Sequence, residues 1–495
     1  MYSLGYDIGS SFIKASVLDM ERGTSVAQAS HPKTEMPILA VRPGWAEQSP
    51  DAWWNALKSA THELISRNSL DTSRIKCIGI TYQMHGLVLV NRFLSVLRPS
   101  IIWCDSRAVE IGNQAFAAIG KKRCSENLLN SPGNFTASKL RWVKENEPDI
   151  YREVYKFMLP GDYIAMKLTG TIGTTISGLS EGILWNFKEN AVASELLDHC
   201  GIDQELIPEM VPTFGVQGYI TEAAAGELAL PSGLPVCYRA GDQPNNAFSL
   251  NVLEPGDVAA NAGTSGVVYG VSGGLGYDPR SRVNLFAHVN HSANRPRLGV
   301  LLCINGVGIL YSWLKKYMAR EAVSYQHMDR AAAEVQMDSN GLMLLPFGNG
   351  AERMLENKNI GCRILNLDFN RHTEAHFYRA AQEGIAFAFR YGMDIMHAMG
   401  VKAKIIRAGT ANMFLSPVFT EVLANVSGSE IELYDADGAL GAARGAAVGA
   451  GIYKTFPEAF EYLTLKKRIT PDPQHTAIYD DIYERWKKIL ESSLL

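Results

Sequence analysis

The sequence predicts an α/β protein with two related domains. Short apolar stretches typical of strands alternate with longer stretches in which apolar residues recur at helical spacing. A strand, a glycine turn and a second strand occur together at residues 7–11 and again at 261–266. The chain has 495 residues, enough for roughly two to four domains. We therefore expect one domain over residues 1–252 and a second over residues 253–495.

The first domain is expected to open with strands and then to alternate strands with helices. Strands are predicted at residues 4–8, 12–18, 25–31, 75–81 and 87–90. Helices are predicted to begin near residue 51 and to cover 137–146 and 162–168. The first of these helices takes Ser49 or Asp51 as its cap, with Pro50 near its first turn.

The second domain partly repeats this order. Strands are predicted at residues 257–262, 267–271, 404–408 and 431–434, and helices at 373–399, 414–426 and 439 to about 453. The last helix lies in a segment made almost entirely of glycine and alanine, residues 438–451. Such small residues permit close packing of a helix on a sheet; the alternative is a low-complexity segment.

Composition narrows the class of protein. Lys+Arg 47 against Asp+Glu 51 gives a net charge of −4, so no basic excess favours a nucleic acid partner. The 7 cysteines stand far apart, which argues against a disulfide framework, a zinc ribbon or a redox dithiol. The N-terminus has no signal-peptide pattern, and the apolar segment 301–314 is too short to span a bilayer. We therefore expect a cytoplasmic protein without a membrane partner.

Both glycine turns have the composition of a phosphate-binding loop. At the first turn, amides near Gly9 and the hydroxyls of Ser10 and Ser11 can face an anion, and Asp7 can hold a hydrated divalent cation. The alternative is a plain hairpin in which Asp7 only caps the turn. The second turn is Gly263-Thr264-Ser265, which lacks the lysine and the following helix of a Walker A loop. Two such turns and an acid suit a nucleotide held between two related domains.

Asp242 is the candidate catalytic base. It follows a predicted strand at 235–238 and precedes the polar run that starts at Gln243. A carboxylate there can accept the proton of a substrate hydroxyl while that hydroxyl attacks a phosphoryl group. The alternative is an Asx-turn.

Three further motifs are candidates for binding residues. Gln83-Met84-His85-Gly86 separates two apolar strands, and either binds substrate or is a turn with a satisfied histidine. Trp103 precedes Asp105 and Arg107. Either Trp103 is the aromatic wall of a pocket that also carries the acid and the base, or Asp105 and Arg107 form a surface ion pair after a core strand. Gly409 and Asn412 lie where a strand runs into a helix, so a flat base can lie against the backbone there; the alternative is a short connecting loop.

Taken together, these motifs resemble the FGGY family of carbohydrate kinases, and within it the members that phosphorylate D-xylulose. The resemblance covers nearly the whole chain, from residue 7 to residue 443. The Gln83–Gly86 tetrapeptide is its most discriminating part. Other markers are residues 44–48, 53–54, 97–99, 102–103, 132–133, 135–136 and 139–140. The resemblance implies two actin-like, ribonuclease-H-like domains, with the active site and its ATP in the cleft between them.

The resemblance also implies roles for single residues. Asp242 matches the catalytic base, and Asp7 matches the acid that helps to hold Mg²⁺. We expect Asp242 to contribute to the metal site as well. Sugar contacts are expected from Met84, His85, Trp103, Asp242 and Gln243. Nucleotide contacts are expected from Gly9, Ser10, Ser11, Gly263, Thr264, Ser265, Gly409 and Asn412. The implied activity is phosphorylation of a ketopentose, D-xylulose at its 5-hydroxyl, with ATP and Mg²⁺ as cofactors.

Three positions depart from the family pattern. Gln243 stands where asparagine is usual after the base, Glu352-Arg353 lacks the Thr-Pro that commonly follows, and Ala408 stands where glycine is usual. The open alternatives are a kinase of the same fold for L-ribulose or glycerol, an ATPase scaffold like actin and Hsp70, and a non-catalytic sugar sensor. A homodimer is a family-level expectation.

Overall fold

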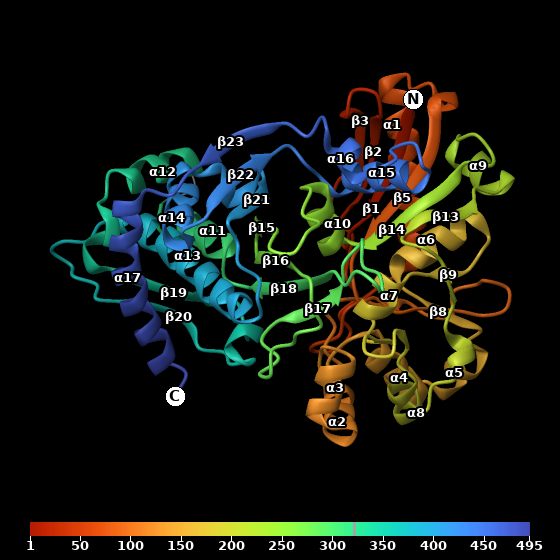
Figure 1. Ribbon diagram of the computed structural model, residues 1–495, viewed down its shortest axis with the longest axis horizontal. Coiled ribbons are helices and arrows are strands. Elements are labelled where there is room, and N and C mark those ends of the chain that lie inside the picture. Colours follow the sequence, from red (N-terminus) through yellow and green to blue (C-terminus); the bar gives the residue numbers. More distant parts are fainter. Residues whose placement is uncertain (320–322) are drawn as a thin grey trace. The chain divides into compact units, whose positions relative to one another are not determined.

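The structure is a computed structural model that describes residues 1–319 and 323–495, and it divides into two compact units (Figure 1). Unit 1 comprises Met1–Asn251, Phe286–Leu298 and Ala436–Leu463. Unit 2 comprises Val252–Leu285, Gly299–Asp435 and Thr464–Leu495. The sequence analysis places a single boundary after residue 252, whereas two segments from the second half of the chain belong to unit 1.

Unit 1 is built on a six-stranded sheet in the order β13-β14-β5-β1-β2-β3. The strands are β1 (Tyr2–Ile8), β2 (Ile13–Asp19), β3 (Thr24–His31), β5 (Ile75–Tyr82), β13 (Phe214–Tyr219) and β14 (Pro235–Gly241). The first three form an antiparallel meander, and β1, β5 and β14 run parallel to one another. The strands predicted at the N-terminus and at 75–81 are therefore confirmed.

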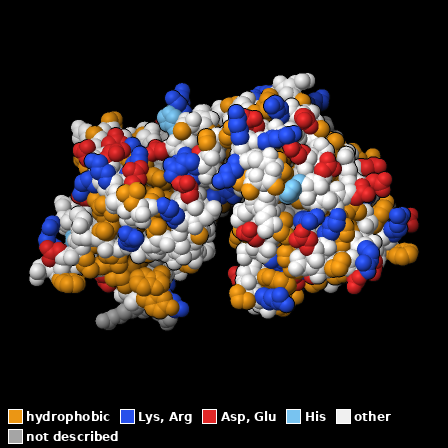
Figure 2. Space-filling view, turned by 90° about the horizontal axis from the view of Figure 1, so that it is seen from below, with side chains coloured by type: hydrophobic (Ala, Val, Ile, Leu, Met, Phe, Trp, Pro, Cys, Tyr) orange, Lys and Arg blue, Asp and Glu red, His pale blue; other side chains and the backbone are white. Residues whose placement is uncertain are grey.

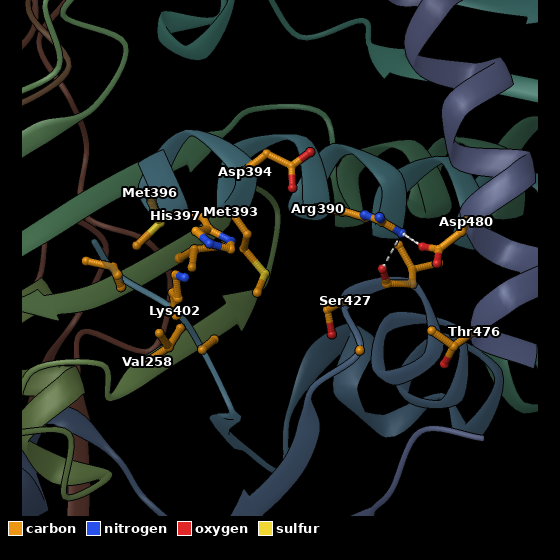
Figure 3. A pocket seen from close by; sticks show the side chains of 15 residues that line it. Val258, Arg390, Met393, Asp394, Met396, His397, Lys402, Ser427, Thr476 and Asp480 are labelled. Carbon is orange, nitrogen blue, oxygen red and sulfur yellow. Dashed lines mark hydrogen bonds and ion pairs between the residues drawn. The ribbon is translucent and has the colours of Figure 1, made fainter. Parts of the chain in front are cut away.

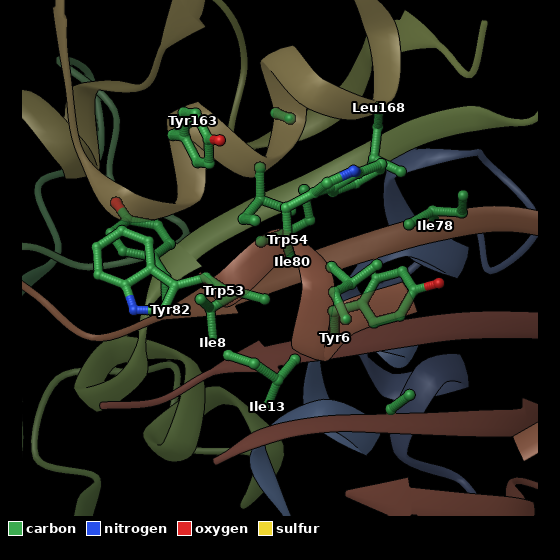
Figure 4. Close-up of a cluster of buried hydrophobic side chains, with 14 of the residues drawn as sticks. Tyr6, Ile8, Ile13, Trp53, Trp54, Ile78, Ile80, Tyr82, Tyr163 and Leu168 are labelled. Carbon is green, nitrogen blue, oxygen red and sulfur yellow. The ribbon is translucent and has the colours of Figure 1, made fainter. Parts of the chain in front are cut away.

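Helix α1 (Pro50–Asn68) covers one face of this sheet, with Ser49 at its N-cap and Pro50 at its start, as predicted. Trp53 and Trp54 on α1 are almost fully buried among strand residues such as Tyr6 and Ile80, in the apolar cluster of Figure 4. Burial of such large side chains contributes on the order of 2–3 kcal/mol each. This cluster fixes the strands whose ends carry the candidate site.

Helix α15 (Gly438–Gly449) packs against β1, β5 and β14 of unit 1. A Cβ atom on Gly5 would lie 1.9 Å from the Ala439 carbonyl oxygen, and one on Gly79 would lie 2.0 Å from that of Ala442. Contact this close requires glycine on the strands and small residues on the helix. The prediction of close helix-on-sheet packing is confirmed, and the low-complexity alternative is wrong.

The remaining elements of unit 1 surround the sheet. The helices are α2 (Val109–Ile119), α3 (Lys121–Asn127), α4 (Thr136–Asn146), α5 (Pro148–Glu153), α6 (Pro160–Thr169), α7 (Ile176–Glu181), α8 (Ser194–Cys200), α9 (Glu222–Leu228), α10 (Asp242–Ser249) and α16 (Phe456–Phe460). The short strands are β4 (Glu47–Gln48), β6 (Val88–Val90), β7 (Ser100–Ile101), β8 (Lys156–Met158), β9 (Gly173–Thr174), β10 (Trp185–Asn186), β11 (Ala191–Val192) and β12 (Glu209–Met210).

Unit 2 contains most of a seven-stranded sheet in the order β17-β18-β16-β15-β21-β22-β23. The strands are β15 (Val258–Ala262), β16 (Gly266–Ser272), β17 (Asn284–Ala287), β18 (Leu298–Ile304), β21 (Ile405–Gly409), β22 (Glu430–Tyr434) and β23 (Leu465–Ile469). An antiparallel pair, β15 and β16, is followed by two strands parallel to β15. The run β16-β15-β21-β22 thus repeats the run β2-β1-β5-β14 of unit 1, as two related domains predict.

The other elements of unit 2 are α11 (Gly308–Tyr317), α12 (Tyr325–Ala333), β19 (Met343–Phe347), β20 (Gly361–Leu365), α13 (Glu374–Ala398), α14 (Pro417–Ser427) and α17 (Pro473–Ser492). The helix predicted at 414–426 is divided into a 3₁₀ turn, Asn412–Leu415, and α14. Ser416 causes the division, because its hydroxyl accepts a hydrogen bond from the Phe419 amide and caps α14.

Acidic and basic side chains are interspersed on the face of the molecule shown in Figure 2, in keeping with a net charge near zero. Across the described part of the chain, we find no helix that combines the length and the apolar character needed to cross a membrane.

Candidate active site

Three parallel strands of unit 1 end side by side, and the candidate residues lie at those ends or directly after them. In the strand register, Asp7 pairs with Thr81, and Tyr82 pairs with both Ile8 and Gly241. Three features therefore lie at one edge of the sheet: Asp7, Asp242 and the turn that starts at Gln83. The carboxyl ends of parallel strands are where open α/β sheets bind their ligands.

The first glycine turn is a closed hairpin between β1 and β2. The Gly9 amide donates to the Phe12 carbonyl oxygen at 3.1 Å, and a Cβ on Gly9 would lie 2.9 Å from that oxygen. The Ser10 carbonyl accepts a hydrogen bond from Gln48 at 2.7 Å. The Ser10 hydroxyl lies 3.5 Å from the indole nitrogen of Trp103, so the structure brings a predicted phosphate residue and a predicted sugar residue together.

Asp7 and Asp242 are buried carboxyl groups, and the charge of Asp7 acts on Asp242. Burial raises the pKa of Asp7 to about 6, and the neighbouring Asp437 adds to the rise while Lys14 opposes it. Burial raises the pKa of Asp242 to about 7, and the charge of Asp7 adds to that rise. Two buried carboxyl groups supply the hard oxygen ligands that Mg²⁺ prefers. Mg²⁺ is usually held by one or two carboxylates together with substrate phosphates. The residues therefore fit a magnesium–nucleotide complex.

Asp242 is the first residue of α10, directly after β14. Its carboxylate accepts hydrogen bonds from the backbone and the side chain of Gln243, which places these two predicted residues in contact. Sequence reasoning did not predict α10. Helix α10 is held to α15 by Asn245, whose side-chain amide donates to the Gly438 carbonyl at 2.9 Å.

His85 adopts the left-handed conformation, with φ 62°, and its ring lies between two phenylalanines. The ring centroids of Phe135 and Phe286 are 4.8 Å and 5.2 Å away. Met84 is buried against Gly241, where a Cβ would lie 2.6 Å from the Met84 Cγ. The predicted sugar residues Met84 and His85 are thus both packed next to the strand end that carries Asp242.

Lys139 on α4 holds the back of this turn. Its Nζ donates to the carbonyl oxygens of His85 at 2.7 Å and of Ile102 at 3.0 Å. The side chain is fully buried, and burial lowers its pKa to about 7. The sequence carried a signal for this role, because a lysine between apolar positions of a predicted helix points inward.

Trp103 is 53% exposed, whereas the side chains of Asp105 and Arg107 are buried. The Arg107 guanidinium pairs with Asp105 at 2.7 Å and lies over the Trp45 ring, 3.7 Å from its centroid. Asp105 also accepts a hydrogen bond from the Ala46 amide at 2.6 Å. The alternative of a surface ion pair is therefore wrong: this pair is interior and anchors the loop that presents Trp103.

The second glycine turn, in unit 2, joins β15 to β16 and abuts the start of α11. The Gly308 amide donates to the Gly263 carbonyl at 2.9 Å, and the Ile309 amide donates to that of Thr264 at 3.2 Å. Asn412 has φ 54°, and its side-chain nitrogen Nδ2 lies 3.5 Å from the position of a Cβ on Gly263. Gly409 ends β21, the strand beside β15. The structure thus gathers the predicted nucleotide residues of this unit, including Ser265, at one edge of its sheet.

A separate cavity of about 370 Å³ lies elsewhere in unit 2 (Figure 3). Arg390 and Asp480 form an ion pair on one side of it, and His397 and Lys402 lie on the other. Its wall includes Val258, the first residue of β15, whereas the glycine turn follows the last residue of that strand. None of the predicted site residues lines this cavity.

Sequence reasoning missed Glu181. This residue ends α7, is fully buried and contacts both the sugar turn and the strand end before Asp242. It stands in a polar stretch, residues 175–181, with no spacing that marks it as a site residue.

Comparison with known proteins identifies the family of this chain. Residues 2–249 match the N-terminal domain of the FGGY family of carbohydrate kinases, and residues 258–450 match its C-terminal domain. A xylulose kinase of Klebsiella pneumoniae is 30% identical, with 96% of each chain covered. An L-xylulose/3-keto-L-gulonate kinase of Escherichia coli is 28% identical, covering 99% of this chain and 96% of the relative.

The fold agrees as well. A solved xylulose kinase from Rhodospirillum rubrum has a TM-score of 0.88 and 27% identity, with 99% of both chains covered. The two-domain α/β architecture is that of the actin-like carbohydrate kinases. The chain belongs to the FGGY family of carbohydrate kinases.

Proposed function

We propose that this kinase transfers the γ-phosphoryl group of ATP to a ketopentose, with D-xylulose and its 5-hydroxyl as the preferred acceptor. The observation that carries the proposal is the position of Asp242 at the sheet edge shared with Asp7 and the Met84-His85 turn. The xylulose kinases among the relatives support the choice of sugar. We propose sugar and ATP as the partners, and a cytoplasmic location.

In this mechanism Asp242 accepts the proton of the attacking hydroxyl. A general base works best with a pKa near the working pH, and burial together with Asp7 raises the pKa of Asp242 to about 7. Met84, His85, Trp103 and Gln243 would position the sugar so that the hydroxyl faces the phosphorus. Positioning and charge neutralisation supply most of the catalysis in phosphoryl transfer.

The nucleotide would be bound by the two glycine turns. Amides and hydroxyls at Ser10, Ser11, Thr264 and Ser265 would face phosphates. Gly9 and Gly263, whose own amides bond within the turns, would let the phosphates approach closely, and Gly409 with Asn412 would face the adenosine end. Asp7 and Asp242 would hold Mg²⁺, which supplies charge neutralisation on the transferring phosphoryl group when bound.

A second candidate is a different sugar acceptor for the same reaction. Gln243 stands where the family members for D-xylulose usually carry asparagine, and it hydrogen-bonds the proposed base. The similarity to an L-xylulose/3-keto-L-gulonate kinase also favours other ketoses as candidates. L-ribulose and glycerol remain acceptors to test.

The test is coupled ADP release with Mg-ATP and a panel of D-xylulose, L-xylulose, L-ribulose, 3-keto-L-gulonate, glycerol and no acceptor. The proposal predicts the highest kcat/KM with D-xylulose. Highest kcat/KM with another ketose or polyol would support the second candidate. ADP release that is equal with and without sugar would contradict a kinase role and favour an ATPase scaffold.

A further inference from the structure

Glu181 is a buried carboxyl group that the proposed mechanism does not use. It is the last residue of α7, and its side chain has no measurable exposure. A buried carboxyl group costs stability unless its polar atoms are satisfied. Its contacts therefore indicate what it does.

Both the side chain and the backbone of Glu181 contact His85. The His85 amide donates to Oε1 of Glu181 at 3.3 Å, and Nδ1 of the imidazole lies 2.9 Å from the Glu181 carbonyl oxygen. Because a carbonyl oxygen only accepts, Nδ1 carries a proton in this contact. Glu181 thereby holds the left-handed backbone and the ring orientation of a proposed sugar-binding residue.

The other carboxyl oxygen of Glu181 lies against the backbone that leads to the proposed base. A Cβ on Gly241 would come within 2.5 Å of Oε2, so glycine is required there while Glu181 occupies this position. Gly241 is followed directly by Asp242. One side chain therefore touches both the sugar turn and the strand end that sets the base.

Helix α7 is itself held firmly in unit 1. The Ser177 hydroxyl donates to the Ala287 carbonyl at 3.0 Å, and the Ser180 hydroxyl accepts from the Ala287 amide at 2.9 Å. Phe286, the preceding residue, packs on the His85 ring. Glu181 is thus presented from a rigid support rather than from a free loop.

Burial disfavours the charged form of this carboxyl group. It raises the pKa of Glu181 well above its usual range, and the charges of Asp242 and Asp162 add to the rise, while hydrogen bonds from the His85 amide and the Tyr82 hydroxyl oppose it.

We infer that Glu181 is a positioning residue that holds the sugar turn and the base-bearing strand end in one arrangement through its buried carboxyl group. This inference rests on the proposed function for the identity of the turn and the base. It assigns no contact with the sugar, because Glu181 is fully enclosed.

The test compares three substitutions at this position in the full-length enzyme. Glu181→Gln keeps an uncharged acceptor for the His85 amide. Glu181→Leu fills the space without an acceptor, and Glu181→Ala leaves it empty. The matched control is Glu383→Gln in unit 2, because Glu383 is also a buried glutamate, ion-paired with Arg379 at 2.9 Å. For each variant we would measure the melting temperature, KM for sugar and for ATP, and kcat, using whichever sugar the wild-type enzyme phosphorylates best.

We expect Glu181→Leu and Glu181→Ala to raise KM for the sugar about tenfold or more and to lower kcat, with KM for ATP within about threefold of wild type. Glu181→Gln should stay within about threefold in every constant. Glu383→Gln should lower the melting temperature without changing KM for the sugar. A Glu181→Leu enzyme with wild-type constants, or a Glu181→Gln enzyme as impaired as Glu181→Leu, would overturn the inference. A wild-type preference for another sugar would refute the preferred substrate alone, because the variants are compared on that sugar.

Discussion

In the proposed mechanism, the chemistry depends on Asp242. Replacing it by asparagine keeps the shape and removes the proton acceptor, so we expect kcat to fall by about 10²–10⁴ while the sugar still binds. Coupled ADP release measures kcat. Tryptophan fluorescence measures sugar binding, because Trp103 is half exposed next to Ser10. Asp203→Asn, at an exposed helix cap far from the sheet edge in sequence, is the control and should keep full activity. Wild-type turnover in Asp242→Asn would refute the assignment of the base.

The pH dependence tests the electrostatic pairing of Asp7 and Asp242. Asp242 must be ionised to accept a proton, and its pKa without metal is raised to about 7. Activity is therefore lost as the pH falls through that pKa. Mg²⁺ near the carboxylates favours their charged form and lowers the pKa. We expect kcat/KM for the sugar to fall on the acid side, with an apparent pKa that decreases as free Mg²⁺ rises. An acid limb near pH 4 at every Mg²⁺ concentration would contradict this pairing.

Single residues differ in how far the sequence revealed them. Asp7 and Asp242 could be predicted, because each lies at the end of an apolar strand and precedes a local polar motif. Glu181 could not, because its contacts with His85 and Gly241 join parts of the chain 96 and 60 residues away. The sequence did not decide whether the Asp105–Arg107 pair lies at the surface or in the interior. Its burial depends on Trp45 and Ala46, which are distant in the chain.

Among the elements, the hairpins and long helices followed from local pattern, whereas α10 did not. Its first residues, Asp242-Gln243-Pro244-Asn245-Asn246, have low helix propensity, and the polar run reads as a turn. Pro244 is tolerated because it lies in the first turn, where backbone amides have no helical partner. Tertiary contacts such as Asn245 to Gly438 supply what the local sequence lacks.

The contact between β5 and α15 gives a prediction at this scale. Gly79→Ala places a methyl group 2.0 Å from the Ala442 carbonyl, so strand and helix must move apart. Overpacking of this kind costs about 1–3 kcal/mol, which urea denaturation would show as a lower midpoint. Gly226→Ala in α9 is the matched control, because no atom lies within 4 Å of its Cβ and the helix should gain about 0.5–1 kcal/mol. Equal midpoints for Gly79→Ala and wild type would contradict the packing described.

For the whole molecule, the repeated sheet order was visible in the sequence as a repeated glycine hairpin, but the composition of the units was not. Residues 286–298 and 436–463 return to unit 1 across long stretches of chain. Hydrophobic periodicity reports the local element and carries no record of such distant partners. The net charge of −4 also gains meaning at this scale, because the proposed nucleotide is anionic and would be bound by local amides and Mg²⁺ rather than by overall charge.

The central claim is phosphoryl transfer to the 5-hydroxyl of D-xylulose. The most direct measurement extends the acceptor panel by identifying the product of the best acceptor by phosphorus and carbon NMR. We predict that D-xylulose is that acceptor and that phosphorus couples to carbon 5, with one ADP released per sugar phosphate. Phosphate on another carbon, another preferred acceptor, or ADP release without sugar phosphate would contradict the claim.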